Sequence, residues 1–242
     1  GETGPATAAH RAQGRFPPQQ VRAIRRAYAA SIAFVDEQIG RILYALQESR
    51  LDRETWIVLS SDHGDAMGDH AQLYKATFLE GSARIPLVVR PPTGTGHPCA
   101  QIRDEVVDLG DILPTCCALA GIPATDVDGA DLGPLLRGED RPWREVWHGE
   151  HWGGRGDFEC LIRGSWKYII DLRSGRELLF DLAVDPGECR DRSSDAADVR
   201  AALRGDLIER LRPRGTDFVD GGDLVIGKAR ACWREEVITA AR

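Results

Sequence analysis

One short loop gathers most of the residues that could do chemistry. Within nine residues it carries five ionisable side chains, Asp62, His63, Asp65, Asp69 and His70. A carboxylate oxygen beside an imidazole nitrogen is a sensible half-site for a divalent cation. Aspartate and glycine are also ordinary loop residues, because aspartate hydrogen-bonds to its own backbone in turns. Two ligands do not complete a metal site, so a cation here needs further donors from elsewhere.

Lys75 follows this loop and has apolar neighbours on both sides. Near a cation site, its ammonium could hold an anionic group of a substrate as a point charge. The alternative is a lysine whose stem packs while its ammonium lies in water. Lysine is rare in this chain: it stands only at positions 75, 167 and 228, and arginine supplies the other 28 basic residues. Because the chain otherwise uses arginine, the lysine at position 75 favours a role that needs a compact ammonium group.

A second, weaker candidate is the stretch around His148 and His151, which flank Glu150 between two tryptophans. Such a stretch could form the rim of a substrate pocket, with His151 binding substrate. Tryptophan-rich loops more often cover a core. No P-loop, dinucleotide-binding glycine motif or hydrolase nucleophile elbow is present in the sequence.

The elements before and after the loop predict an α/β fold. Apolar residues at steps of three and four predict a helix from Gln19 to Ser49. The runs at 55–60 and 85–90 are apolar on both faces, which is typical of strands buried inside a sheet. A helix is expected from Val107 to Gly121, with Asp108 as its N-cap and Pro114 delaying its start.

The second half of the chain has a different residue composition and a different pattern of expected secondary structure. Residues 122–158 are rich in glycine, proline and aspartate and predict irregular structure. Short strands are expected at 160–163, 166–171 and 177–181, followed by a helix at 195–211. We therefore expect a loop or cut start at 1–18, an α/β part at 19–140, an antiparallel α+β subdomain at 141–212 and a tail without pattern at 213–242.

Composition limits the classes of function. The chain has 242 residues, 42% of them hydrophobic, and a net charge of −7. This acidic balance argues against a general nucleic-acid binder, and no apolar run is long enough to span a bilayer. Residues 1–20 hold no signal-peptide core, which leaves cytoplasm and export both open. The six cysteines lack metal-ligand spacing, and Cys116 and Cys117, in an apolar helical pattern, predict buried thiols.

Several stretches resemble the type I sulfatases of the alkaline phosphatase superfamily. The resemblance begins with Leu59–His70 (LSSDHGDAMGDH), then Lys75, then Gly81–Arg90 (GSARIPLVVR). It continues in the same order through further segments, namely Asp111–Thr115, Ala120–Pro123, Asp128–Gly129, Leu135–Gly138, Ile162–Arg163, Trp166–Tyr168, Glu177–Leu182 and Asp185–Glu188.

This resemblance implies a fold and an activity. It implies part of an α/β sandwich followed by a small antiparallel subdomain, and hydrolysis of a sulfate ester on a small molecule or glycan. The metal pair of the family falls on Asp62 and His63, its sulfate-contacting lysine on Lys75, and a less fixed position near the site on His70. The cation is usually calcium, although a histidine ligand makes a divalent ion the safer expectation.

The sequence also departs from the family. Sulfatases carry a Cys or Ser in a C/S-x-P-x-R motif that matures to formylglycine, and an early Asp-Asp metal pair. Neither stands in these 242 residues. We therefore expect a C-terminal part of the enzyme that is inactive alone and pairs with the missing half or with itself. A phosphodiesterase or phosphonate monoester hydrolase of the same superfamily, or a binding domain that keeps the fold, are the alternatives.

Overall fold

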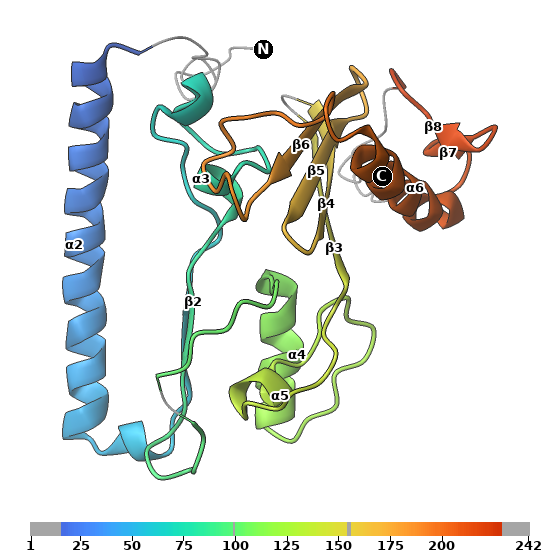
Figure 1. Cartoon of the computed structure of the whole chain (residues 1–242). Coiled ribbons are helices and arrows are strands. Elements are labelled where there is room, and N and C mark those ends of the chain that lie inside the picture. The colour runs from blue at the N-terminus through green and yellow to red at the C-terminus, as the bar shows by residue number, and fades with distance from the viewer. Residues whose placement is uncertain (1–15, 99, 154–155, 229–242) are drawn as a thin grey trace, which may run out of the picture. The chain divides into compact units, whose positions relative to one another are not determined.

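The computed structural model describes residues 16–98, 100–153 and 156–228. Contacts divide the chain into two compact units (Figure 1). The first unit comprises residues 1–74 and 84–143, and the second comprises residues 75–83 and 144–242. Asp62, His63 and His70 therefore belong to the first unit, whereas Lys75 and His151 belong to the second.

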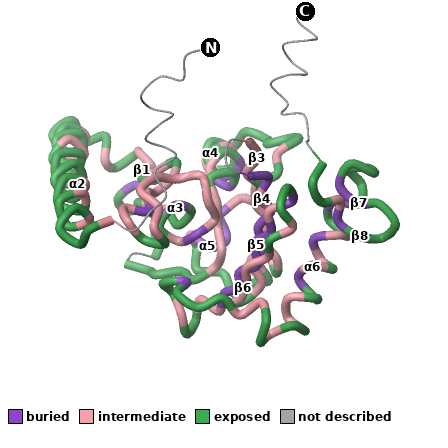
Figure 2. The backbone as a smooth tube through the Cα atoms, turned by 90° about the horizontal axis from the view of Figure 1, so that it is seen from above, coloured by how far each residue is buried: buried purple, intermediate pink, exposed green. Residues whose placement is uncertain are grey.

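The first unit begins with the long helix α2 (Pro18–Glu48), which confirms the helix that the apolar spacing predicts. Pro18 is tolerated in the first turn because its missing N–H has no intrahelical partner there. None of the helix is buried, and the side chains of Phe34, Ile42 and Tyr44 are all more than 60% exposed. Figure 2 shows α2 mostly in the colour of exposed residues. Part of its apolar surface is thus open to solvent, while Ile24, Tyr28, Ile39 and Leu46 are half-buried.

The strands β1 (Ile57–Ser60) and β2 (Leu87–Arg90) lie where the sequence predicts strands. The burial on two faces that is typical of such apolar runs requires neighbouring strands, and the described residues supply none beyond these two. They pair antiparallel with each other in a two-stranded sheet, and Leu59 and Val88 are 39% and 55% exposed. A two-stranded sheet cannot cover both of its faces by itself.

A short 3-10 turn, η3 (Leu109–Asp111), precedes α4 (Ile112–Leu119). Asp108 caps this turn as predicted: its side chain accepts a hydrogen bond from the Gly110 N–H at 2.7 Å, and its own N–H donates to Asp111 at 2.9 Å. The α-helix starts later than Val107, with Pro114 in its first turn, where proline is tolerated. Gly121 has a φ of +68° and ends the helix, as expected.

The cysteine prediction in α4 is wrong. Cys116 is exposed and Cys117 only half-buried, because the inward face of this helix is made by Pro114 and Thr115. Thr115 joins α4 to the segment before α5 (Gly133–Leu136) by accepting a hydrogen bond from the Leu132 N–H at 2.9 Å.

The second unit is built on a four-stranded antiparallel sheet in sequential order. Its strands are β3 (Val146–Gly153), β4 (Gly156–Arg163), β5 (Trp166–Asp171) and β6 (Arg176–Asp181). β5 and β6 confirm the predicted strands, and β4 confirms the strand predicted at 160–163 but begins four residues earlier, inside the stretch predicted as irregular. β3 lies within the stretch that the sequence predicts as irregular, and it pairs with β4 over its whole length.

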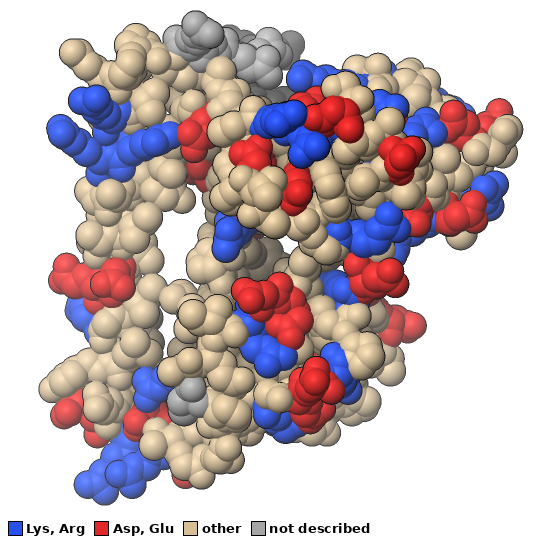
Figure 3. Space-filling view, in the orientation of Figure 1, with Lys and Arg blue, Asp and Glu red and all other residues tan. Residues whose placement is uncertain are grey.

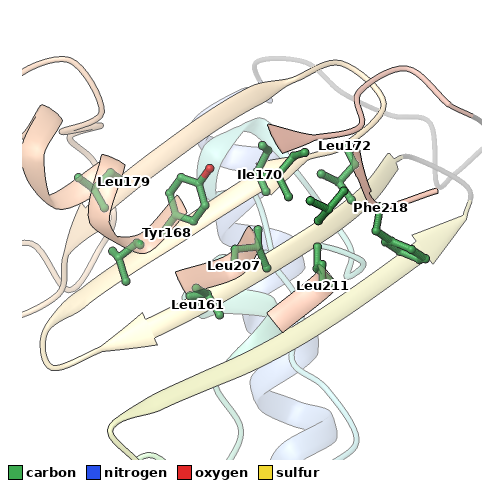
Figure 4. Close-up of a cluster of buried hydrophobic side chains, with 11 residues drawn as sticks. Leu161, Tyr168, Ile170, Leu172, Leu179, Leu207, Leu211 and Phe218 are labelled. Carbon is green, nitrogen blue, oxygen red and sulfur yellow. The ribbon is translucent and has the colours of Figure 1, made fainter. Parts of the chain in front are cut away.

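One face of this sheet packs against the helix α6 (Ala197–Leu211), near its predicted limits. Three leucines of the helix are fully buried, and they meet apolar side chains of the sheet (Figure 4). The labelled members of this cluster are Leu161, Tyr168, Ile170, Leu172, Leu179, Leu207, Leu211 and Phe218. The opposite face carries a smaller cluster that includes Cys160, Ile169 and Phe180.

Residues 213–228 form more regular structure than their pattern predicts. The short turn η4 (Arg212–Arg214) leads to the two-residue strands β7 (Val219–Asp220) and β8 (Asp223–Leu224). Phe218, Val219 and Leu224 are buried in the cluster beneath α6. On the face drawn in Figure 3, basic and acidic side chains are interspersed. Across residues 16–98, 100–153 and 156–228, no helix has both the length and the apolar character to cross a membrane.

Candidate active site

Asp62 and His63 stand directly after β1, and the structure brings their side chains together. His63 Nε2 lies 3.2 Å from Asp62 Oδ2, and the His63 N–H donates to Asp62 Oδ1 at 3.0 Å. Ser61 fixes the turn, because its hydroxyl donates to the His63 carbonyl oxygen at 2.9 Å. The Asp62 side chain is 81% exposed and that of His63 is 32% exposed, so both can be reached from outside.

The hydrogen bond made by His63 Nδ1 determines which role His63 Nε2 can take. Nδ1 lies 2.9 Å from the Gly64 carbonyl oxygen, and a carbonyl only accepts hydrogen bonds, so this geometry assigns a proton to Nδ1. In a neutral ring, Nε2 then presents a lone pair beside a carboxylate oxygen, and a proton or a cation must separate the two. Histidines that bind metals commonly donate their other N–H to a backbone carbonyl in this way.

Asp62 and His63 supply only part of the set of ligands that a divalent cation needs. They offer one oxygen and one nitrogen donor, and among the residues described by the structure no group of three or more His, Cys, Asp or Glu could hold a metal. A cation bound here therefore needs donors in addition to this pair, as the sequence predicts.

The loop after this pair is closed by its own backbone and held to α2. Paired backbone hydrogen bonds join Ala66 to Tyr74, Met67 to Leu73 and Gly68 to Gln72. From the helix, Arg25 reaches Asp69 at 2.6 Å and the Met67 carbonyl oxygen at 3.2 Å.

His70 lies at the tip of this loop, within η2 (Asp69–Ala71), and is exposed. Its φ is +50°, and Met67 and Ala71 also have positive φ. Non-glycine residues in this region are strained, and such strain is often stored at functional sites.

Lys75 opens the segment of the second unit that leads into α3 (Glu80–Ala83). It is partly buried, and Ala76 after it has a φ of +76°. Leu79 is buried in the cluster on the sheet face opposite α6. The ring of Phe78 meets Trp147 edge-on, with the ring centroids 6.1 Å apart. The sheet of the second unit thus carries the segment that follows Lys75.

His151 lies on β3, opposite Phe158 of β4. Partial burial lowers its pKa below the ordinary value, because burial disfavours the charged imidazolium. His148 lies on the other face, where its Nε2 is 2.8 Å from the fully buried Glu159. Trp152 donates to the same carboxylate at 3.0 Å. These two residues therefore hold a buried carboxylate, while His151 stands apart from that network.

Comparison with known proteins places the chain. A model of the sulfatase family matches residues 4–122. An arylsulfatase of Clostridium perfringens is 34% identical over 219 residues, which cover 89% of this chain and 46% of that protein. A solved 2-O GAG sulfatase aligns with a TM-score of 0.72 at 25% identity, covering 87% of this chain and 46% of the other.

This chain is a relative of the type I sulfatases. It shares their alkaline-phosphatase-like fold, with a small antiparallel sheet toward the C-terminus, and it spans less than half the length of the arylsulfatase that it matches. The phosphonate monoester hydrolase of Agrobacterium radiobacter shares the fold too. It aligns with a TM-score of 0.68 at 33% identity, over 80% of this chain and 42% of that one. Sulfatases in general use a divalent metal, which agrees with the donor pair after β1.

Sequence reasoning missed one group of charged residues in the second unit of this sulfatase relative. Lys167, Glu80 and Glu188 meet in the second unit although they are far apart in the chain. The rarity of lysine, which drew attention to Lys75, could also have pointed to Lys167, because the chain has only three lysines.

Proposed function

We propose that this chain supplies the metal pair and the substrate lysine of an enzyme that hydrolyses sulfate esters. The observation that supports this proposal is the geometry of Asp62 and His63. The Nδ1 atom of His63 hydrogen-bonds to the Gly64 carbonyl oxygen, and its Nε2 atom lies beside a carboxylate oxygen of Asp62. The nucleophile motif is absent from these 242 residues, so catalysis needs a segment that carries it. Residues 19–140 as part of the catalytic domain and 141–212 as a subdomain belong to this proposal.

In this proposal Asp62 and His63 hold one divalent cation, calcium by the family pattern, together with carboxylates from outside the chain. Bound there, the cation would polarise the oxygens of a sulfate ester. His63 keeps Nδ1–H on the Gly64 carbonyl, so Nε2 is the ring nitrogen that would ligate the cation. An imidazole nitrogen is a poorer ligand for calcium than an oxygen, whereas imidazole suits zinc, so zinc and manganese should be compared with calcium.

Lys75 and His70 take the catalytic roles. The ammonium of Lys75 neutralises negative charge that builds on the sulfate in the transition state. His70, on its strained loop tip, lies near the leaving group and exchanges a proton with it. The tether from Arg25 to Asp69 keeps that loop tip in place.

His151 takes the substrate-binding role. Its pKa is lowered by burial, so it is neutral at neutral pH. A neutral imidazole both donates and accepts a hydrogen bond, which suits the hydroxyl groups of a sulfated small molecule or glycan.

A second candidate function is the hydrolysis of phosphonate monoesters. The similarity to the Agrobacterium enzyme at 33% identity favours it, and a cation with a lysine serves either anion. Rates on para-nitrophenyl sulfate and on a para-nitrophenyl phosphonate separate the two functions.

The test of the metal pair uses this chain together with a segment of a relative that carries the C-x-P-x-R motif. Asp62→Ala should lose both the bound divalent ion, measured by elemental analysis, and turnover of para-nitrophenyl sulfate. Asp104→Asn is the matched control, because Asp104 is an exposed aspartate of the same unit. Near-normal metal content and turnover in Asp62→Ala would refute the assignment.

A further inference from the structure

A buried ion-pair network joins the segment after Lys75 to the sheet of the second unit. Lys167, on β5, is only 1% exposed. Its ammonium donates to the Phe78 carbonyl oxygen at 2.8 Å, to Glu80 at 2.5 Å and to Glu188 at 2.9 Å. All three protons of the ammonium are thereby used.

Glu188 closes the network from the other side. Its first carboxylate oxygen binds Lys167, and its second accepts the backbone N–H of Glu80 at 2.6 Å. Glu188 is 3% exposed and has a φ of +53°, a backbone conformation that is strained for a residue other than glycine. The backbone at residues 78–80 is therefore held by Lys167 at one carbonyl and by Glu188 at one N–H.

The charges of the network support each other. Burial would lower the pKa of Lys167, but Glu188 and Glu80 act against it, and the pKa ends above its ordinary value. The ammonium thus stays charged. In other proteins, buried ion pairs can be replaced by apolar residues with little loss of stability. Stability alone is therefore a poor reason for this network.

Aromatic packing fixes the same segment independently. The Phe78 ring lies against Trp147 and also near Gly149, where a Cβ would come within 3.0 Å of the ring. Lys75 stands three residues before Phe78, so its Cα lies within about 11 Å of that anchor even in a fully extended chain. The turn closed by the Thr77 hydroxyl, which accepts the Leu79 N–H at 3.0 Å, limits the segment further.

We propose that Lys167 and Glu188 are positioning residues for Lys75. They bind the backbone of residues 78–80 to the sheet, and the sheet thereby sets where the ammonium of Lys75 lies. The inference rests on the proposed role of Lys75 in sulfate ester hydrolysis. Neither Lys167 nor Glu188 touches substrate in this account.

The first readout is hydrogen exchange in the 242-residue chain. In Lys167→Met, the amides of Leu79, Glu80, Ser82 and Ala83 should exchange at least about tenfold faster, because uncompensated buried carboxylates weaken the local structure. The amides of α6 should keep their protection. Lys228→Met is the matched control, since Lys228 is an exposed lysine of the same unit. Equal change in α6 and in residues 79–83, or no change in either, overturns the proposal.

The second readout is turnover in the presence of the complementing segment. Lys167→Met should lower kcat for para-nitrophenyl sulfate by about 10- to 100-fold, the scale of a misplaced catalytic group, with a smaller change in KM. If Lys167→Met does not fold, Glu188→Gln carries both readouts, because it keeps the size and one acceptor of Glu188.

The two proposals fail separately. If Lys75→Ala abolishes turnover while Lys167→Met leaves kcat unchanged, positioning by Lys167 is overturned and the role of Lys75 stands. If Lys75→Ala leaves turnover unchanged, the role of Lys75 is overturned, and with it the function of this network as a positioning device.

Discussion

Replacing Gly149 with alanine tests the packing beneath the segment that follows Lys75. A Cβ on Gly149 would lie 2.2 Å from Cη2 of Trp147, 2.8 Å from its Cζ2 and 3.0 Å from Cε1 of Phe78. Real contacts are not this close, so the Trp147 ring must move. Its edge-on partner Phe78 restricts that movement.

Gly149→Ala should lower the free energy of unfolding, whereas a Gly→Ala change with space for the new Cβ raises it. In a strand interior, Gly→Ala usually gains about 0.5–1 kcal/mol from backbone entropy. Overpacking of a filled core typically costs about 1–3 kcal/mol. We therefore expect Gly149→Ala to be destabilised by about 1 kcal/mol, the difference between the middle values of these two effects. Urea unfolding followed by tryptophan fluorescence measures this free energy of unfolding.

Gly205→Ala is the control for this prediction. Gly205 lies in α6 of the same unit, and a Cβ there would meet nothing within 4 Å. This variant should gain about 0.5–1 kcal/mol of stability, the difference in helix propensity between the two residues. If Gly149→Ala is as stable as Gly205→Ala, the described packing of Trp147 and Phe78 is wrong.

Four further predictions follow from other parts of the molecule. Asp111→Ala should cost about 2–4 kcal/mol by urea unfolding, because the N–H groups of Asp108 and Ala130 lose their acceptor at about 1–2 kcal/mol each. The pKa of His151 is lowered by burial, so its neutral form favours folding; the midpoint of thermal unfolding should fall as pH drops below about 6.5, and less so in His151→Gln. In complemented enzyme, Lys75→Ala should lower kcat about 10²–10³-fold with little change in KM, and Lys75→Arg should not restore it fully; equal kinetics in all three proteins would remove Lys75 from the site. The exposed apolar side chains of α2 should make the chain self-associate in light scattering, and Phe34→Asp should reduce the measured mass, whereas a monomeric wild-type chain would contradict this.

Local patterns predicted the parts of the fold that local physics decides. The spacing of apolar residues from Ile24 onward gave α2 to within one residue at each end. The side chain of Asp108 and the backbone freedom of Gly121 marked the limits of the η3–α4 segment. The short strand patterns and the turn at 173–175 gave β5, β6 and the second half of β4. In each case the deciding interactions lie within a few residues of each other.

Long-range contacts decided what the sequence did not reveal. β3 contains two glycines and a glutamate, which disfavour a strand, yet pairing with β4 makes it one. The burial expected of β1 and β2 depends on neighbouring strands that the described residues do not supply. β7 and β8 have only two residues each, too short for any periodicity.

The candidate site shows the same division. The adjacency of Asp62 and His63 can be read from the sequence, but the hydrogen bond that assigns the Nδ1 proton of His63 requires the turn to be known. The contact of Lys167 with Glu80 joins residues 87 positions apart, and no local pattern indicates it. Side chains that bind an ion are thus predictable by type, whereas those that hold a segment in place are not.

Complementation tests the central claim most directly. The 242-residue chain and a sulfatase segment chosen because it carries the C-x-P-x-R motif are expressed separately and together, with formylglycine formation verified by mass spectrometry. Hydrolysis of para-nitrophenyl sulfate is then measured with added calcium. We predict no turnover by either piece alone, and turnover by the pair that is lost in Asp62→Ala and in Lys75→Ala. Turnover by this chain alone, or by a pair in which both substitutions are silent, would contradict the account.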